Sequence, residues 1–200
     1  AKVMYNELFS KLLKALNNIG KKPIMAYGGY ESIILCNTNS PARLYGVAQS
    51  VGYGEYRAIT PVGGGMPVNK YYFLPTHCRM RFDDVARILS EHGYFSASKS
   101  EKEHALDYYR DICNCGICHE IIRDDINGFS TYNDSIPYTV KTRNGILTKN
   151  RPTTDATLIA AIHFLNCKVF EWNYIENEDL STVLDNLKSC YAQYQPKLAG

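Results

Sequence analysis

The 200 residues suffice for one domain, since domains cluster at about 100–150 residues. Apolar residues make up 45% and charged residues 21%, so the chain can bury a core and is not disordered throughout. The formal net charge of +2 excludes a polycationic nucleic-acid binder but allows a local basic patch. No apolar stretch approaches the roughly 18–20 residues of a membrane span, and no secretory signal is visible, so we expect no membrane partner.

The seven cysteines are an odd number, so they cannot all pair in internal disulfides. Three of them lie in the segment Cys113-Asn-Cys115-Gly-Ile-Cys118, where restrictive disulfide geometry makes close neighbours poor partners for one another. In a reducing compartment such a cluster indicates a metal site, and we expect a cytoplasmic protein.

Apolar residues near a 3.6-residue period predict an amphipathic helix over residues 3–19. Short apolar segments predict strands over 23–27 and 43–49, whereas periodicity cannot assign residues 30–36 between them. The glycine-rich segment Gly63-Gly64-Gly65 then predicts a loop.

The following segments predict a strand, a helix and a second strand. Residues 70–75 and 94–97 have the composition of strands, and the spacing of Phe82 to Leu89 predicts a helix that ends at Gly93. This order is typical of a βαβ unit, which implies parallel strands and a right-handed crossover. Another helix is expected over 100–111, directly before the cysteines.

The last third of the chain begins with a polar segment. Residues 124–152 are rich in Asn, Asp, Thr and Gly and predict a long loop or a hairpin insertion. Thr154 or Asp155 can cap a helix that runs to about residue 171, and a last helix is expected from about 178 to 195. The first of these helices has an apolar face made of Leu158, Ile162, Leu165 and Val169.

The three clustered cysteines predict a zinc site, because zinc takes four thiolate or imidazole ligands in a tetrahedron. His163, on a predicted helix, can supply the fourth ligand; Cys167, one helical turn further, is the alternative, and His119 is sterically awkward. A closed four-ligand site is structural, so we expect this Zn²⁺ to stabilise the fold rather than to catalyse. Three unrelated buried cysteines are the other interpretation. The predicted ligands are Cys113, Cys115, Cys118 and His163.

The Cys-x-Cys-x-x-Cys element, followed by a helix that bears a histidine, resembles the zinc site of tRNA-guanine transglycosylases and their DNA-modifying relatives. Four further segments resemble the family in the same order as the chain, over roughly residues 40–190, although only the cysteine spacing is specific by itself. They are Tyr45-Gly-Val-Ala-Gln49 with Tyr53-Gly-Glu-Tyr-Arg57, the loop at Gly63-Gly64-Gly65, Tyr94-Phe-Ser-Ala-Ser98, and the helix from Leu158 to Phe170.

The resemblance implies a TIM barrel with a zinc subdomain that exchanges guanine for a 7-deazaguanine base in tRNA or DNA, through a covalent intermediate on an aspartate. Barrel chemistry lies at the C-terminal ends of strands, where Gln49 is expected to read the purine or 7-deazaguanine base. Gly64 and Gly65 would let the backbone approach that base. The alternative is that Gln49 satisfies loop backbone and that the glycines form a turn.

The chain departs from the family in length and at the nucleophile. A complete barrel needs roughly 250 residues, and Phe95 stands where the resemblance places the aspartate. We therefore expect an α/β, TIM-barrel-derived and partial fold, with a barrel-derived part over 1–111 and a zinc-binding helical part over 112–200. Exchange would need a partner chain in a homo- or hetero-oligomer. The alternatives are a non-catalytic zinc-bearing subunit for nucleic-acid binding or dimerisation, and an unrelated small zinc protein.

Basic residues are interleaved with Tyr132 and Tyr138 in and around the polar segment, a composition suited to phosphate contact and base stacking. They are Lys141, Arg143, Lys149 and Arg151. They predict a surface that binds tRNA or DNA, and the alternative is a solvated loop.

Overall fold

Contacts between residues divide the chain into two compact units. The first contains Ala1–Pro61 with Lys168–Gln193, and the second contains Val62–Cys167 with Tyr194–Gly200. We describe each unit by itself.

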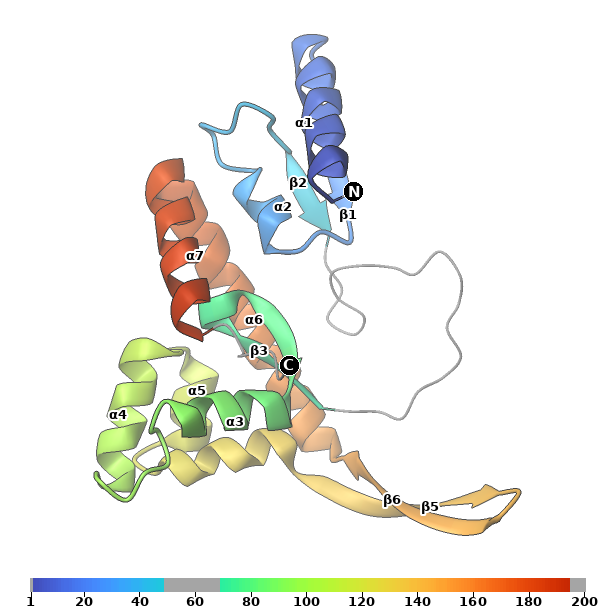
Figure 1. Cartoon of the computed structure of the whole chain (residues 1–200), viewed down its shortest axis with the longest axis vertical. Coiled ribbons are helices and arrows are strands. Elements are labelled where there is room, and N and C mark those ends of the chain that lie inside the picture. The colour runs from blue at the N-terminus through green and yellow to red at the C-terminus, as the bar shows by residue number, and fades with distance from the viewer. Residues whose placement is uncertain (1, 49–68, 195–200) are drawn as a thin grey trace. The chain divides into compact units, whose positions relative to one another are not determined.

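The structure is a computed structural model of the whole chain (Figure 1). It describes residues 2–48 and 69–194, without the side chains of residues 2–6. The predicted base-reading residues Gln49, Gly64 and Gly65 therefore lie outside the described residues.

A short parallel sheet forms the first unit together with helices. Its elements are α1 (Lys2–Asn18), β1 (Ile24–Ala26), α2 (Tyr30–Ile34), β2 (Gly46–Ala48), the C-terminal part of α6 (Thr154–Asn177) and most of α7 (Leu180–Tyr194). The predicted helix over 3–19 and the strand over 23–27 are confirmed, and the strand predicted over 43–49 is shorter. Gly28 lies in the turn between β1 and α2. A Cβ at this position would lie 2.7 Å from Val47 Cγ1, so a larger residue does not fit there.

The second unit holds the remaining elements. They are β3 (Lys70–Phe73), the 3₁₀ helix η1 (Leu74–Thr76), β4 (Cys78–Arg81), α3 (Phe82–Glu91), α4 (Glu101–Asp111), α5 (Gly116–Ile122), the 3₁₀ helix η2 (Ile126–Asn133), β5 (Ser135–Thr142), β6 (Gly145–Pro152) and the N-terminal part of α6. The helices predicted around Phe82 to Leu89 and over 100–111 are confirmed as α3 and α4. Ser100 and Glu103 begin α4 with a reciprocal capping box.

The predicted βαβ unit is wrong. β3 pairs with β4 in an antiparallel register that places Lys70 opposite Arg81, and residues 94–97 form turns rather than a strand. The cause is η1, where Pro75 sits in a tight turn and His77 adopts a left-handed conformation with φ 53°, so the chain reverses before α3 begins.

Three sheets of two strands each account for all strands of the described residues, and only the β1–β2 pair is parallel. The described residues therefore show a mixed α/β fold with a small parallel sheet and no eight-stranded barrel. We predicted a barrel-derived part over residues 1–111 and a zinc-binding helical part over residues 112–200. This division by barrel origin and metal binding stays a prediction.

The core of the second unit is aromatic and buries six of the chain's 16 tyrosines. Tyr71 lies on β3 and packs edge-on against Phe129 and Tyr132 of η2, at ring distances of 5.2 and 5.1 Å. Its hydroxyl also hydrogen-bonds the buried hydroxyl of Tyr108 on α4. Since buried hydroxyls need partners, these pairs fix the three elements against one another.

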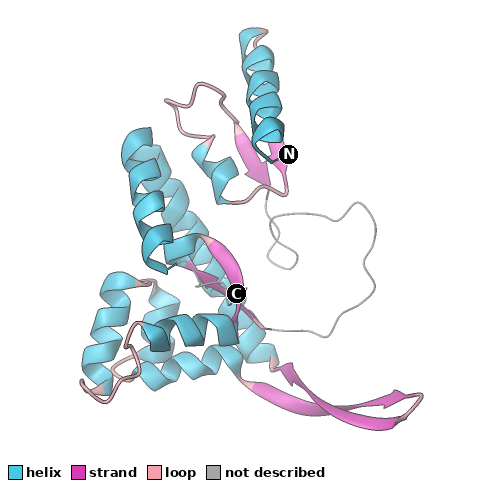
Figure 2. Cartoon of the chain, viewed as in Figure 1, coloured by secondary structure: helices cyan, strands magenta, loops and turns pink. Residues whose placement is uncertain are grey.

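The polar segment forms η2 and then an antiparallel hairpin, so the hairpin alternative is correct. β5 and β6 are joined by Arg143 and Asn144, and the ribbon extends away from the helices of its unit (Figure 2). Gly145 follows with φ 121°, a conformation that L side chains rarely adopt. The base of the hairpin closes where the Thr153 N–H donates to the Asp134 carbonyl at 2.9 Å.

Helix α6 is longer than predicted and ends at Asn177. The predicted apolar face of Leu158, Ile162, Leu165 and Val169 is exposed, while Ala160, His163, Phe164 and Cys167 on the other side are buried. Within the described parts of the chain, no helix combines the length and apolarity that crossing a membrane requires.

Candidate metal centre

The four predicted ligands come together in the second unit. Cys113 follows α4, Cys115 caps α5, Cys118 lies in the first turn of α5, and His163 lies on α6. Their ligand atoms all lie within 4.8 Å of one another. The geometry of this Cys₃His cluster is compatible with a bound metal such as zinc.

The tight turn between α4 and α5 presents the three sulfurs together. The N–H groups of Ile112 and Cys113 both donate to the Tyr108 carbonyl, at 2.9 and 3.2 Å, and this ends α4. Cys115 then takes the extended N-cap conformation and α5 begins at Gly116. Cys118 comes three residues after this cap, so its sulfur lies 3.5 Å from that of Cys115.

The spacings between ligand atoms are close to those of a zinc tetrahedron. Bond lengths of about 2.3 Å to sulfur and 2.0–2.1 Å to nitrogen imply S···S edges of about 3.8 Å and S···N edges of about 3.5 Å. His163 Nδ1 lies 3.4, 3.5 and 4.0 Å from the sulfurs of Cys115, Cys118 and Cys113. A metal at the centre therefore needs only small movements of Cys113.

A backbone hydrogen bond selects the tautomer of His163. Its Nε2 lies 2.8 Å from the Tyr72 carbonyl, which can only accept, so Nε2 carries the proton. The ring also stacks on Tyr71 with centroids 4.4 Å apart. Nδ1 is thus the nitrogen that faces the three sulfurs, and it is the atom that would ligate a metal once its own proton has left.

The electrostatics of the cluster favour a cation. Burial raises the pKa of the Cys118 thiol, whereas hydrogen bonds from Cys113 and Cys118 lower the pKa of Cys115. Burial alone lowers the pKa of His163, but hydrogen bonds to Cys115 and Cys118 outweigh it and raise this pKa to about 10. A protonated imidazole thus balances thiolate charge, and a divalent metal ion would replace that proton and hold all three thiolates.

Two tyrosines surround the sulfur of Cys118, and no motif in the sequence indicates them. The hydroxyl of Tyr132 lies 3.2 Å and that of Tyr108 3.4 Å from Cys118 Sγ. Burial raises the pKa of both phenols, so they stay protonated and can donate to a thiolate.

Cys167 lies beside the cluster rather than within the group of four. Its sulfur is 3.8 Å from Cys113 Sγ and 3.6 Å from His163 Nε2, the nitrogen that faces the Tyr72 carbonyl. His119 is exposed, stacks on Tyr109 and bonds Asn114.

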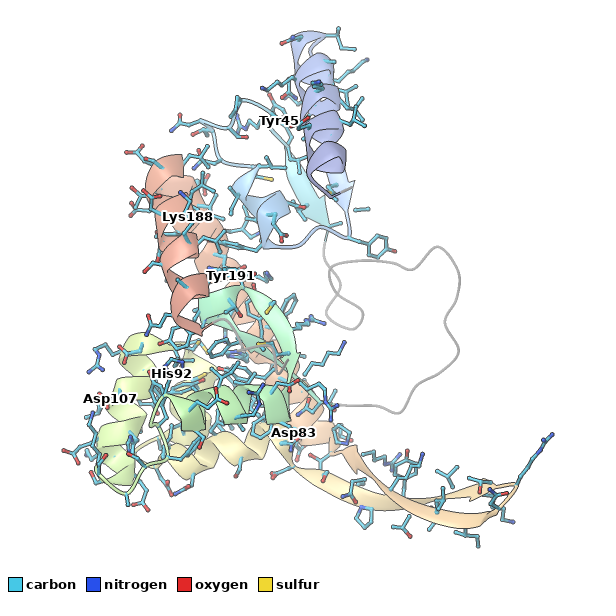
Figure 3. The ribbon with its side chains drawn as sticks, in the orientation of Figure 1. Tyr45, Asp83, His92, Asp107, Lys188 and Tyr191 are labelled. Atoms are coloured by element: carbon cyan, nitrogen blue, oxygen red, sulfur yellow. The ribbon has the colours of Figure 1, made fainter. Side chains whose placement is uncertain are left out.

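A polar pocket of the second unit lies between the segment after α3 and helix α4, with His92 and Asp107 among its lining residues (Figure 3). Asp107 pairs with Lys99 at 2.5 Å and with Arg110 at 2.9 Å, and the hydrogen bond from Lys99 lowers its pKa. His104 Nε2 donates to the Ser96 carbonyl at 2.9 Å. Because these charges pair with one another, we assign the pocket no ligand.

The predicted basic residues are all exposed on the hairpin: Lys141 on β5, Arg143 in the turn, and Lys149 and Arg151 on β6.

No protein-family model, no curated protein and no solved structure matches the chain. The relation to transglycosylases thus stays a resemblance.

We expect the purified protein to hold about one zinc ion per chain, and His163→Gln to lose it. Structural zinc contributes about 10–16 kcal/mol in small peptides, comparable with the roughly 5–15 kcal/mol net stability of a domain. Chelation should therefore unfold the second unit, as seen by metal analysis and circular dichroism during heating. Cys190→Ser on α7 is the control that keeps its metal, and a metal-free, equally stable wild type would contradict the assignment.

Tyr132→Phe removes one hydroxyl and keeps the ring that packs against Tyr71. We expect metal affinity to fall by roughly 10–100-fold with an unchanged fold, because supporting hydrogen bonds to metal ligands typically have effects of this size. Competition against a chromogenic chelator measures the affinity. Tyr138→Phe on the hairpin is the matched control, and equal affinities for the two variants would show that this hydroxyl gives the thiolate no support.

Proposed function

We propose that the protein binds nucleic acid through the β5–β6 hairpin, and that a zinc ion at the Cys₃His cluster fixes the base of this arm. The observation that carries the proposal is the charge of the hairpin. Residues 135–154 contain four basic side chains and no acidic one, whereas the whole chain has a net charge of only +2. The rest of the chain is therefore net acidic, and the hairpin is a local concentration of positive charge that can attract phosphate.

The strand register distributes the hairpin's charges on both faces and at the tip. Tyr138 pairs with Lys149 and Ile136 with Arg151, so these side chains share one face, and the Arg151 guanidinium lies 6.0 Å from the Tyr138 ring. Lys141 lies on the opposite face. A two-stranded ribbon fits a nucleic-acid groove, and charges on both faces can then reach phosphates on either side of it.

The cluster's ligands flank the hairpin along the chain. Cys118 on α5 precedes η2 and β5, while His163 follows β6 on α6. A metal that binds both would hold the two ends of the arm together and limit the motion of its base. Lower mobility before binding reduces the entropy lost on association.

Replacing Lys141, Arg143, Lys149 and Arg151 by Gln should weaken binding to tRNA and duplex DNA and flatten its salt dependence. Each lost contact to B-form DNA should reduce the slope of log K against log salt by about 0.9. Fluorescence anisotropy titrations at several salt concentrations give both quantities.

A matched control carries the same charge change elsewhere, with Lys11, Lys14, Lys21 and Lys22 replaced by Gln on or near α1, where these lysines are exposed. It should keep the wild-type slope. An unchanged slope in the hairpin variant, or no binding by the wild type at low salt, would contradict the proposal.

Base exchange in tRNA or DNA is the second candidate function, supported by the meeting of the three cysteines with the helical His163, as the resemblance to guanine transglycosylases implies. In this proposal a partner chain completes a TIM-barrel-derived fold and supplies the aspartate. Gln49, Gly64 and Gly65 would contact the base.

The isolated chain is expected to incorporate no labelled guanine into tRNA or DNA, because Phe95 cannot form the glycosyl ester that a carboxylate forms. Base binding should weaken in Gln49→Ala, since an amide can both donate to and accept from a purine edge. Robust incorporation by the chain alone would instead point to Asp83 or Asp84 in the first turn of α3, of which Asp83 is exposed and pairs with Arg81 (Figure 3).

A further inference from the structure

A fourth sulfur lies against the Cys₃His cluster. Cys167 is 1% exposed, and its Sγ is 3.8 Å from that of Cys113. Cys115 and Cys118 form a second close pair at 3.5 Å. A zinc tetrahedron of three cysteines and one histidine does not need a fourth thiol, so the role of Cys167 is open.

The fourth thiol makes the number of cluster sulfurs even. Three thiols can form one disulfide, and the third is then left to react further toward sulfinic acid or with another chain. Close neighbours in sequence are generally poor disulfide partners, but Cys115 and Cys118 have the Cys-x-x-Cys spacing of redox-active pairs and their sulfurs lie 3.5 Å apart. The four thiols in two close pairs can therefore all be oxidised to disulfides. The two pairs also differ in what they connect: Cys115–Cys118 lies within one turn, whereas Cys113–Cys167 joins that turn to α6.

We propose that the four cysteines are an oxidation site for hydroperoxides, at which Cys115–Cys118 and Cys113–Cys167 form two disulfides and the metal is released. In each pair, one thiolate attacks the peroxide oxygen, the O–O bond breaks, and a sulfenic acid forms with loss of water or an alcohol. The second sulfur then attacks the sulfenic sulfur and forms the S–S bond, and the hydroxyl of the sulfenic acid leaves as water. Two thiols thus give up two electrons and two protons for each peroxide; where they are metal-bound thiolates, water supplies the protons.

Exposure sets the order of the two steps. Cys115 is the only cluster cysteine that is not buried, so a peroxide reaches its sulfur first and Cys118 resolves the sulfenic acid. The metal then loses two of its ligands, and Cys113 becomes available to Cys167. The resulting disulfide keeps the α4–α5 turn attached to α6 after the metal has left.

The test compares wild type with Cys167→Ala and Cys167→Ser, each loaded with zinc and treated with hydrogen peroxide. A chromogenic chelator reports metal release, and mass spectrometry of alkylated peptides maps the disulfides. We expect both disulfides in the wild type, and full recovery of zinc binding after reduction with dithiothreitol. The Cys167 variants should bind zinc as the wild type does, form only Cys115–Cys118, and recover incompletely because Cys113 is over-oxidised or cross-linked. Cys190→Ser should behave as the wild type.

Three results would overturn the proposal: no Cys113–Cys167 disulfide in the oxidised wild type, equal recovery of wild type and Cys167 variants, or loss of zinc binding in both variants, which would make Cys167 a ligand. The disulfide map is readable with or without bound metal and needs no nucleic acid. The oxidation proposal can therefore fail or succeed independently of the proposed nucleic-acid binding.

Discussion

The hydrogen bond from His163 Nε2 to the Tyr72 carbonyl is the contact on which the second unit depends. It joins α6 to β3 and leaves Nδ1 facing the sulfurs at the α4–α5 turn. The ring simultaneously stacks on Tyr71, whose hydroxyl reaches Tyr108, so one imidazole belongs both to the aromatic core and to the metal cluster. The aromatic core and the Cys₃His cluster therefore share His163. An unpaired charge at the cluster would lie against the buried aromatic rings, and a buried charge is costly unless it is paired.

This arrangement explains how a long polar insertion can separate the cysteines from His163 along the chain while the four side chains still meet. The chain leaves the cluster after Cys118, forms η2 and the hairpin, and returns on α6 with His163. Tyr132 lies in η2, and its hydroxyl approaches Cys118, so even the connecting segment is tied to the cluster before the hairpin begins. The closing bond from Thr153 to Asp134 then defines where the ordered base ends and the exposed ribbon starts. The extra residues form an appendage of the unit rather than a part of its core.

Features of the fold set by local chemistry could be predicted from the sequence. Regular apolar spacing predicted α1 and α3, and the close spacing of the three cysteines predicted that they form one metal-binding turn, whereas helix α5, which begins inside this segment, was not expected. The β3–β4 hairpin was missed because the apolar–polar alternation of Cys78–Arg81 spans only four residues, and its pairing depends on the turn at Pro75 and His77. The Tyr72 carbonyl and the Tyr132 hydroxyl could not be found either, because these contacts join residues distant in sequence and carry no motif.

Two faces of helix α6 compete for burial: the predicted apolar face and the face that carries His163 and Cys167. Its leucine and isoleucine stripe predicts a buried face, yet Leu158, Ile162 and Leu165 are 56%, 38% and 47% exposed. Full burial of such a side chain is worth about 1.5–3 kcal/mol, so partial exposure of three costs roughly a few kcal/mol. Turning that stripe inward would rotate His163 and Cys167 away from the cluster, and structural zinc sites contribute about 10–16 kcal/mol in zinc-finger peptides. A zinc ion bound by the cluster would therefore outweigh the apolar face and set the rotation of α6 about its own axis.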